Sequence, residues 1–223
     1  MSYGLGRKES IDQRDLNFPM KAALPKAEPL RDHKYWNSNG IWLDQGETSS
    51  CVGHAWTHAI EDGPVMYKAA GSIIDPYHVY REAQKVDEWD GENYDGTSVR
   101  AGAKVLQAMG FISAYTWAFD LETTVKAIIT TSPVIVGTDW FYSMFHPDKD
   151  GVIKLEKYSS NAGGHAYLIN GVNRTKGMFR IKNSWGRGWS KGGHAYISFE
   201  DFERLMYRGG EICLPIEVKK QTS

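Results

Sequence analysis

The hydrophobic pattern changes character near the middle of the chain, and this change limits the possible folds more than any other feature. In the first half, apolar residues recur at the intervals of amphipathic helices. In the second half, short β-branched and aromatic runs are bounded by Gly, Asn and Asp, as strands usually are. Because helices and strands are segregated, we expect an α+β fold with two lobes and a cleft between them.

Four helices are expected in the first half. Residues 51–62 carry apolar side chains at i, i+3, i+4, i+7 and i+8, which form one stripe, and Ser49 or Ser50 is a suitable N-cap. The other three are expected from Asp75-Pro76 onward, over Ser98–Met109 before Gly110, and over Leu121–Ile129 after Asp120.

The expected strands lie in the second half, over Pro133–Thr138, His165–Val172, Met178–Asn183, Ala195–Phe199 and Glu211–Ile216, with a short helix at Glu200–Met206. Residues 1 to about 30 combine charge and proline with little periodicity. We expect them to form an irregular arm that lies on the domain or is partly disordered.

Composition excludes several classes of function. A net charge of −1 gives no electrostatic basis for binding nucleic acid or an anionic membrane. The chain has no apolar run of transmembrane length, and its start, MSYGLGRKES, lacks the apolar core of a secretory signal. Two cysteines allow one disulfide at most, which indicates a reducing compartment. We therefore expect a protein that is cytoplasmic or carried in a bacteriophage context. We also expect no cofactor and no metal.

Cys51 is a candidate nucleophile. It begins an expected helix, where free N–H groups and the helix dipole favour a thiolate. Gln45 lies upstream in a turn-like stretch, and its amide and the Cys51 N–H are two possible donors for an oxyanion. The alternative is that Cys51 is a small buried hydrophobic residue.

Cys51, His54 and His58 also project from one face of the expected helix, so they could be three zinc ligands. A helix N-terminus repels a cation, however, and no fourth ligand is evident. We favour the alternative that both histidines are polar-face or lobe-interface residues.

The letters GGHAY occur at 163–167 and again at 192–196, so either His165 or His194 could be the base that a thiolate requires. His165 opens an expected strand, and Asn183 ends another. A neutral asparagine can fix the tautomer of an imidazole without adding charge. Taken alone, a histidine at the start of a strand is more often structural.

Three segments together resemble a known family. QGETSSC resembles the segment around the nucleophile of papain-like cysteine peptidases, GGHAYLINGV is similar to their histidine strand, and IKNSWGRGWSKGGHAYISF is similar to their Asn-Ser-Trp-Gly segment. The likeness extends from about Leu30 to Pro215, with the motifs in the family's order.

The resemblance implies a role for each matched residue. Cys51 would be the nucleophile, His165 the base that then protonates the leaving amine, Asn183 its orienting partner, and Gln45 a donor of the oxyanion hole. Trp185 would shield the His–Asn hydrogen bond and Trp189 would pack beside it, whereas His194 would be a packing residue.

The resemblance also implies a papain-like fold, with a helical left lobe that carries Cys51 and an antiparallel β-rich right lobe that carries His165. We expect an arm over 1–29 and a peptidase domain over 30–223, with the left lobe at about 45–130, the right lobe at about 131–215 and the N-terminal segment packed across.

The sequence departs from the family at several positions. Thr48 stands where a disulfide cysteine is usual, Val52 replaces a tryptophan, and Gly164 replaces an acidic residue. The missing disulfides point to a cytosolic or bacteriophage-type relative. An arm of about 30 residues leaves no room for the family's long propeptide, so we hypothesise that the arm itself lies in the cleft.

Gly96 resembles the glycine that hydrogen-bonds an extended substrate, and Gly137, Gly163 and Ala166 match positions that line the specificity pocket. All are small, so we hypothesise a roomy pocket for a bulky side chain. The acidic stretch at 87–96 would favour basic substrates if it bordered the cleft, but such runs are more often solvated loops.

The expected function is hydrolysis of peptide bonds through a Cys51 thioester, with a peptide or protein as the substrate. One alternative is a catalytically silent peptide-binding module with the same fold. Another is amide or isopeptide acyl transfer at the same Cys–His dyad. The sequence leaves open the natural substrate, endo- or exopeptidase action and the oligomeric state.

Overall fold

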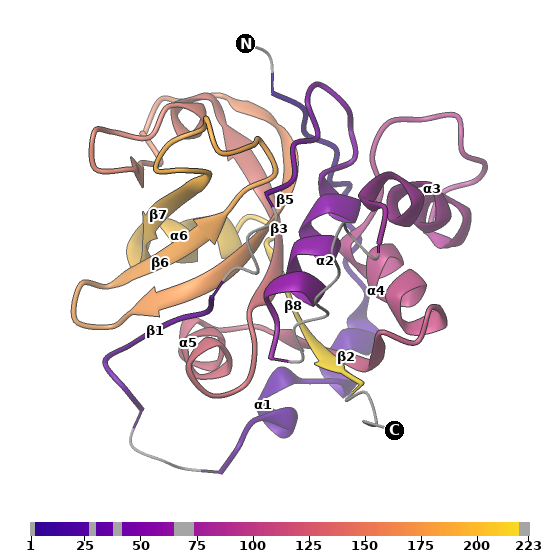
Figure 1. Cartoon of the computed structure of the whole chain (residues 1–223), viewed down its shortest axis with the longest axis horizontal. Helices are drawn as coiled ribbons and strands as arrows, with labels where there is room; N and C mark the ends of the chain where they lie inside the picture. The colour runs from indigo at the N-terminus through magenta and orange to yellow at the C-terminus, as the bar shows by residue number, and fades with distance from the viewer. Residues whose placement is uncertain (1–2, 27–29, 38–41, 65–73, 219–223) are drawn as a thin grey trace.

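The computed structural model describes residues 3–26, 30–37, 42–64 and 74–218. Helices α2, α3 and α4 gather on one side of the molecule and most strands on the other (Figure 1). The chain enters at the top of this view and passes between the two groups. The expected α+β architecture, with a helical lobe and a strand-rich lobe, is confirmed.

The four expected helices form close to their expected ranges, as α2 (Cys51–Asp62), α3 (Pro76–Val86), α4 (Val99–Ala108) and α5 (Leu121–Thr130). Side-chain caps explain three of their starts. Asp75 accepts a hydrogen bond from Tyr77 N, Ser98 from Ala101 N, and Asp120 from Thr123 N.

The start of α2 differs from the expectation. Ser50 occupies the N-cap position, but its side chain makes no capping hydrogen bond. Its hydroxyl instead lies 2.6 Å from Thr48 Oγ1 and 3.2 Å from His54 Nδ1. Helix α2 is held by burial rather than by its cap, because all twelve of its residues are buried.

The strands form one eight-stranded sheet among the described residues, with the order β2-β8-β3-β5-β6-β7-β4 and with β1 paired to β5. Their bounds are β1 His33–Tyr35, β2 Ile112–Ala118, β3 Val134–Phe141, β4 Val152–Ile153, β5 Asn161–Asn173, β6 Met178–Lys182, β7 His194–Ser198 and β8 Glu211–Glu217. All pairs are antiparallel except β4 with β7. The five strands expected in the second half are all present, and helix α6 (Phe199–Met206) separates β7 from β8.

Two hydrophobic clusters lie on opposite faces of β3 and β5. Ile135 and Leu168 face the helices α2 and α4, whereas Val136 and Tyr167 face the interior of the strand-rich lobe. Alternate residues of a strand point to opposite faces, so one pair of strands serves both lobes. Helix α5, expected in the left lobe, packs its buried residues in the strand-rich cluster.

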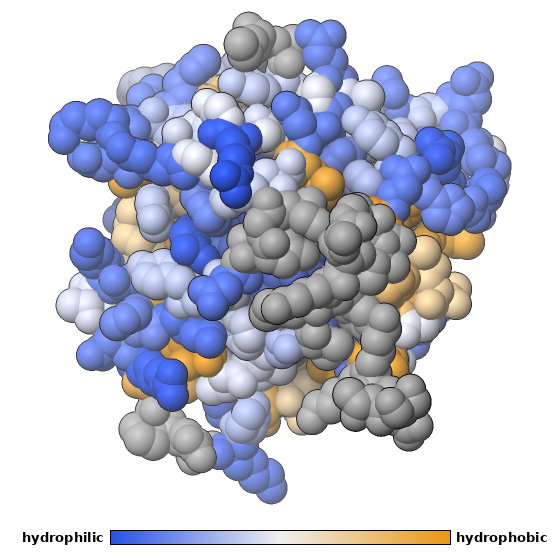
Figure 2. Space-filling model, viewed as in Figure 1, coloured by the Kyte–Doolittle hydropathy of each residue, from blue (hydrophilic) through white to orange (hydrophobic). Residues whose placement is uncertain are grey.

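The arm is more ordered than the composition indicates. It contains a 3-10 helix over Gln13–Asn17 and a short helix, α1, over Met20–Ala23, whose Met20 is fully buried in the strand-rich cluster. The face shown in Figure 2 is mostly hydrophilic, with small apolar patches. No helix within the described ranges is long and apolar enough to cross a membrane.

Candidate active site

Cys51 is the first residue of α2, and its sulfur lies against β5. The backbone N–H of Ala166 donates to Cys51 Sγ at 3.3 Å. This contact places the thiol beside the residue that directly follows His165. Because the side chain is fully buried, desolvation raises the pKa of Cys51 to about 12.

His165 of β5 is held by Asn183, which directly follows β6. Nε2 of His165 lies 2.8 Å from Asn183 Oδ1, and the same oxygen accepts a hydrogen bond from Ser184 N. Since Oδ1 is an acceptor, Nε2 is the donor and Nδ1 carries the lone pair. Nδ1 is buried and has no hydrogen-bond partner among the described residues. Desolvation lowers the pKa of His165 to about 4, so the imidazole is neutral in this state.

Aromatic rings enclose this imidazole. Trp185 stacks on His165 with ring centroids 4.8 Å apart, and Trp189 meets Trp185 edge to face at 5.2 Å. Trp140 of β3, which the sequence analysis did not single out, packs edge to face on His165 at 4.9 Å. These rings exclude water from the His–Asn hydrogen bond, which strengthens it.

Gln45, six residues before Cys51 in the sequence, is fully buried. Its Oε1 accepts a hydrogen bond from the Ser184 hydroxyl at 2.6 Å, which fixes the orientation of the side-chain amide. Nε2 donates to Thr48 O at 2.8 Å and to Leu5 O at 3.3 Å. The carbonyl oxygen of Leu5, in the arm, therefore accepts a hydrogen bond from the Gln45 amide, which is expected to stabilise an oxyanion.

Residues 3–9 of the arm, which we call the cleft segment, run along this site. Gly6 N and Arg7 N both donate to Gly164 O at 2.9 Å. Thr97 N donates to Gly6 O, and Lys8 N donates to Thr97 O, so Arg7 pairs with Thr97 as a parallel bridge. Tyr3 stacks on Trp185 at 4.6 Å.

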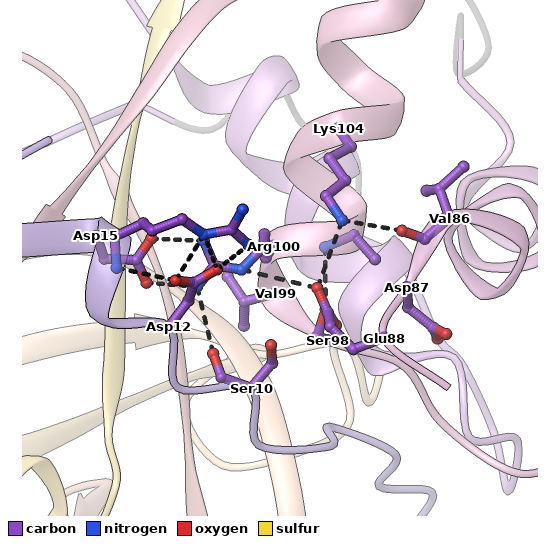
Figure 3. Close-up of polar contacts among 12 residues, drawn as sticks. Ser10, Asp12, Asp15, Val86, Asp87, Glu88, Ser98, Val99, Arg100 and Lys104 are labelled. Carbon is purple, nitrogen blue, oxygen red and sulfur yellow. Dashed lines mark hydrogen bonds and ion pairs between the residues drawn. The ribbon is translucent and has the colours of Figure 1, made fainter. Parts of the chain in front are cut away.

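The arm is also fastened outside the cleft. Arg100 of α4 forms an ion pair with Asp15, and Arg100 Nη1 lies 2.5 Å from Asp15 Oδ1 (Figure 3). The same guanidinium lies 3.7 Å from Glu88. This buried pair holds the arm to the helical lobe beyond the point where the cleft segment ends.

The residues expected to bind substrate surround the cleft segment. A Cβ on Gly96 would meet Gly6 O at 2.3 Å, one on Gly137 would meet Arg7 Cγ at 3.1 Å, and one on Gly163 would meet Leu5 Cδ1 at 3.0 Å. Ala166 lies beside Gly137 in the sheet, and Trp185 Nε1 donates to Gly4 O at 3.1 Å. The arm thus occupies the space that the sequence analysis assigns to a peptide.

His54, His58 and His194 make their contacts with residues other than Cys51 and His165. His54 is buried against Ser50 and Tyr77, and His58 accepts a hydrogen bond from Leu43 N at 3.1 Å. His194 packs edge to face on Trp42 after the turn at 192–193. Within the described residues, no group of three His, Cys, Asp or Glu side chains is arranged to hold a metal.

The acidic stretch at 87–96 borders the cleft segment through aromatic rings. Lys8 Nζ lies 3.8 Å from the Trp89 ring centroid and 3.7 Å from that of Tyr94. Asp87 accepts hydrogen bonds from Tyr94 and Thr97, so it fixes this loop internally. The contact with a basic residue is therefore a cation–π contact rather than an ion pair.

Sequence reasoning missed two charged residues of the site. Arg7 fills a buried space beside Gly137 and pairs with Glu211, the first residue of β8. Arg7 lies in a segment without periodicity, and Glu211 was assigned only to a strand. The one available signal was a charged residue at the start of an otherwise apolar strand.

The chain is similar to known proteins of one family. The model of the papain family of cysteine proteases matches residues 62–206, which include His165 and Asn183. A curated relative, an uncharacterized peptidase C1-like protein of Acanthamoeba polyphaga mimivirus, is 22% identical over 201 residues, which cover 71% of this chain. The chain spans 64% of that relative's length.

Solved structures show the same fold at low identity, which confirms the expected papain-like architecture. Xylellain, a cysteine protease from Xylella fastidiosa, is 20% identical with a TM-score of 0.77, and the match covers 98% of each chain. Digestive procathepsin L2 proteinase from the Tenebrio molitor larval midgut is 19% identical with a TM-score of 0.69, and the match covers 96% of this chain and 78% of that one.

Proposed function

Because the chain belongs to the papain family of cysteine proteases, we propose that it is a cysteine peptidase that hydrolyses peptide bonds through a Cys51 thioester. The observation that carries the proposal is the contact between Ala166 N and Cys51 Sγ. It supports a Cys51–His165 dyad, because Ala166 directly follows His165 in β5. His165 Nε2 is fixed on Asn183, and its Nδ1 has no hydrogen-bond partner among the described residues.

In the proposed reaction, His165 Nδ1 takes the thiol proton and the Cys51 sulfur attacks the carbonyl carbon of a peptide. The Gln45 amide and the Cys51 N–H stabilise the oxyanion that forms. His165 then gives its proton to the leaving amine as the C–N bond breaks. Water, deprotonated by His165, attacks the thioester, releases the carboxylic acid and restores the thiol.

Asn183 acts on the imidazole rather than on the substrate. By accepting from Nε2, it keeps Nδ1 directed at the reacting atoms and supports the imidazolium without adding a negative charge. Trp185 keeps water away from this hydrogen bond. Asn183→Ala should therefore cost less activity than the loss of Cys51.

The substrate of the proposed reaction is a peptide or protein, and the cleft segment occupies its place in the state described. The full chain is thus proposed to be a closed form, opened when the arm is displaced. We also propose a cytoplasmic location, supported by two cysteines that are both free and buried.

The test is hydrolysis of casein and of a fluorogenic peptide library by the full chain and by two pairs of matched variants. Cys51→Ala should abolish turnover, whereas Cys213→Ala, which removes the other buried thiol, should retain it. His165→Ala should likewise abolish turnover, and His194→Ala should retain most of it.

If Cys51→Ala retained full activity, the thioester mechanism would be wrong. If no variant or condition gave peptide hydrolysis while Cys51 still reacted with thiol reagents, the silent peptide-binding module would replace the proposal. Turnover of isopeptide or simple amide substrates alone would favour the other acyl transfer.

A further inference from the structure

We propose that a cavity between the arm, α4 and β2 is a binding site for a small aromatic carboxylate, and that its occupant holds the arm in the cleft. The cavity has a volume of about 410 Å³, which lies within the range of small-molecule sites. None of residues 3–9 lines it, so it lies apart from the cleft segment. Binding at this site is independent of the proposed peptidase function, whereas its effect on activity rests on that function.

The walls of the cavity come from two parts of the chain. The arm contributes Asp12, Asp15 and Phe18 on one side, and the body contributes side chains from residues 100–107 of α4 and 114–117 of β2 on the other. Because both walls are needed, the cavity exists only while this part of the arm is docked. A ligand that fills it therefore binds the docked state and shifts the arm toward that state.

The aromatic rings of the cavity suit a planar ligand. Tyr115 and Trp117 line it from β2, with ring centroids 6.1 Å apart in an edge-to-face arrangement. Phe18 lines it from the arm and is 59% exposed, although its side chain is large and apolar. An aromatic ring in the cavity would remove part of this apolar surface from water and could stack on these rings.

The charges of the lining favour an anion. Both carboxylate oxygens of Asp12 accept from Arg14, and both carboxylate oxygens of Asp15 accept from Arg100. These four residues form two closed pairs. Lys104 is the remaining charged residue of the lining, and no carboxylate of the lining pairs with it.

The contacts of Lys104 leave it able to bind a carboxylate. Its Nζ donates to Val86 O at 3.0 Å and lies 3.4 Å from Glu88 Oε1, which lies outside the lining (Figure 3). The same oxygen lies 3.7 Å from Arg100 Nε, so two cations share it. An ammonium can donate three hydrogen bonds, so Lys104 keeps one for a ligand.

Short stretches of chain link the cavity to the cleft segment. Only residues 10 and 11 separate the cleft segment from Asp12. On the body, Thr97 hydrogen-bonds to the cleft segment through both its N–H and its carbonyl oxygen, and it lies three residues before Arg100. A ligand that holds residues 12–18 keeps the cleft segment close to its place at high effective concentration, so the arm should leave the cleft less often.

The first experiment measures binding to the full chain by calorimetry, with a naphthoate as the probe and the corresponding naphthamide as its uncharged counterpart of the same shape. The carboxylate should bind at least about tenfold more tightly than the amide, the difference typical of a hydrogen bond to a charged group. Lys104→Met should remove most of this difference. Lys154→Met, which removes a lysine 3.5 Å from Asp148 and outside the cavity, should leave it unaltered.

A second variant locates the binding site. Ala114 lines the cavity from an exposed position on β2, so Ala114→Trp should fill the cavity with an indole and abolish binding of both probes. Equal affinities for the two probes, or binding that survives Ala114→Trp, would overturn the proposed site.

The second experiment follows hydrogen exchange of the backbone amides of residues 6–8 in the full chain by mass spectrometry. A naphthoate concentration of about ten times its measured Kd should slow this exchange about tenfold, because the probe stabilises only the docked state. Gly6→Val supplies the rates of a displaced segment, since a Cβ at this positive-φ position would meet Ser49 O at 2.1 Å. Exchange in β6 is the internal control and should not change.

The exchange rates and the peptidase rate separate this proposal from the proposed function. Hydrolysis of a fluorogenic peptide by the full chain should fall by the same factor as the exchange. Exchange that stays unaltered although the probe binds would overturn the link between the cavity and the arm. Slower exchange in a chain that hydrolyses no peptide would leave the site standing and overturn the peptidase function.

Discussion

At the scale of single residues, burial keeps the two reacting groups neutral. Desolvation raises the pKa of Cys51 to about 12 and lowers that of His165 to about 4. Both shifts oppose the thiolate–imidazolium pair. The cleft segment contributes to this burial, because Leu5 and Gly6 hydrogen-bond to Gln45 and Gly164 beside the dyad.

The first prediction concerns the pH dependence of Cys51 alkylation. A raised thiol pKa keeps the protonated form through neutral pH, so the full chain should react with iodoacetamide only as the pH becomes strongly alkaline. Displacing the arm with Gly6→Val admits solvent and lowers that pKa, so the onset should move to lower pH. Mass spectrometry of the labelled peptide against pH measures both profiles.

Cys213 serves as an internal control for this measurement. It is fully buried away from the cleft, and desolvation raises its pKa as well. Its labelling should stay slow in both chains. Identical Cys51 profiles with and without Gly6→Val would show that the arm does not control the thiol.

Sequence alone predicted the residues that belong to local motifs better than those that reach the site from distant parts of the chain. Gln45, His165 and Asn183 belong to local motifs, and hydrogen bonds join His165 to Asn183, Asn183 to Ser184 and Ser184 to Gln45. Glu211 could not be predicted in the same way. Its contact with Arg7 spans 204 positions along the chain and depends on strand register, which no local pattern specifies.

At the scale of elements, the N-cap residues explain why the starts of three helices could be predicted. Asp75, Ser98 and Asp120 mark helix starts through local hydrogen bonds, so α3, α4 and α5 were placed within a residue or so. Strand β2 was missed, because Ile112–Ala118 shows no strict alternation of buried and exposed residues. Its pairing with β8 at the end of the chain supplies the stability that its pattern does not show.

The end of α2 is tied to the sheet by a buried ion pair. Lys182 Nζ lies 2.8 Å from Asp62 Oδ1, both side chains are fully buried, and Asn170 Nδ2 donates to Asp62 Oδ2 at 3.2 Å. Desolvation lowers the pKa of Lys182, and Asp62 opposes this shift. The pair joins the helix that begins at Cys51 to the strand that ends before Asn183.

Asp62→Ala should therefore lower the free energy of unfolding by about 3–5 kcal/mol, because it takes the carboxylate from a buried ammonium. Urea denaturation followed by circular dichroism measures the loss. The double variant Asp62→Leu/Lys182→Met should recover most of it by replacing both charges with apolar groups. A loss below about 1 kcal/mol in the single variant would contradict this account of the pair.

At the scale of the whole molecule, two lobes share one pair of strands, and the chain's own arm lies between them (Figure 1). The two-lobe architecture could be predicted because helices and strands occupy different halves of the sequence. The course of the arm could not be predicted, because the sequence around Gly4 and Gly6 has no hydrophobic periodicity. These glycines lie where the backbone of the arm approaches the backbone of the domain closely, since a Cβ on Gly4 would meet Thr48 O at 2.1 Å.

The central claim is that the chain is a cysteine peptidase closed by residues 3–9, and the most direct measurement is the initial rate of fluorogenic peptide hydrolysis by Gly6→Val against the unaltered chain. Gly188→Val, at a glycine with open space around it, is the matched control. We predict at least about a tenfold higher rate for Gly6→Val, because docking weakened by about 1.4 kcal/mol opens the cleft tenfold more often. The control should be unchanged, and Cys51→Ala in the same background should abolish the rate. Equal rates for Gly6→Val and the unaltered chain, with both variants folded, would contradict the claim.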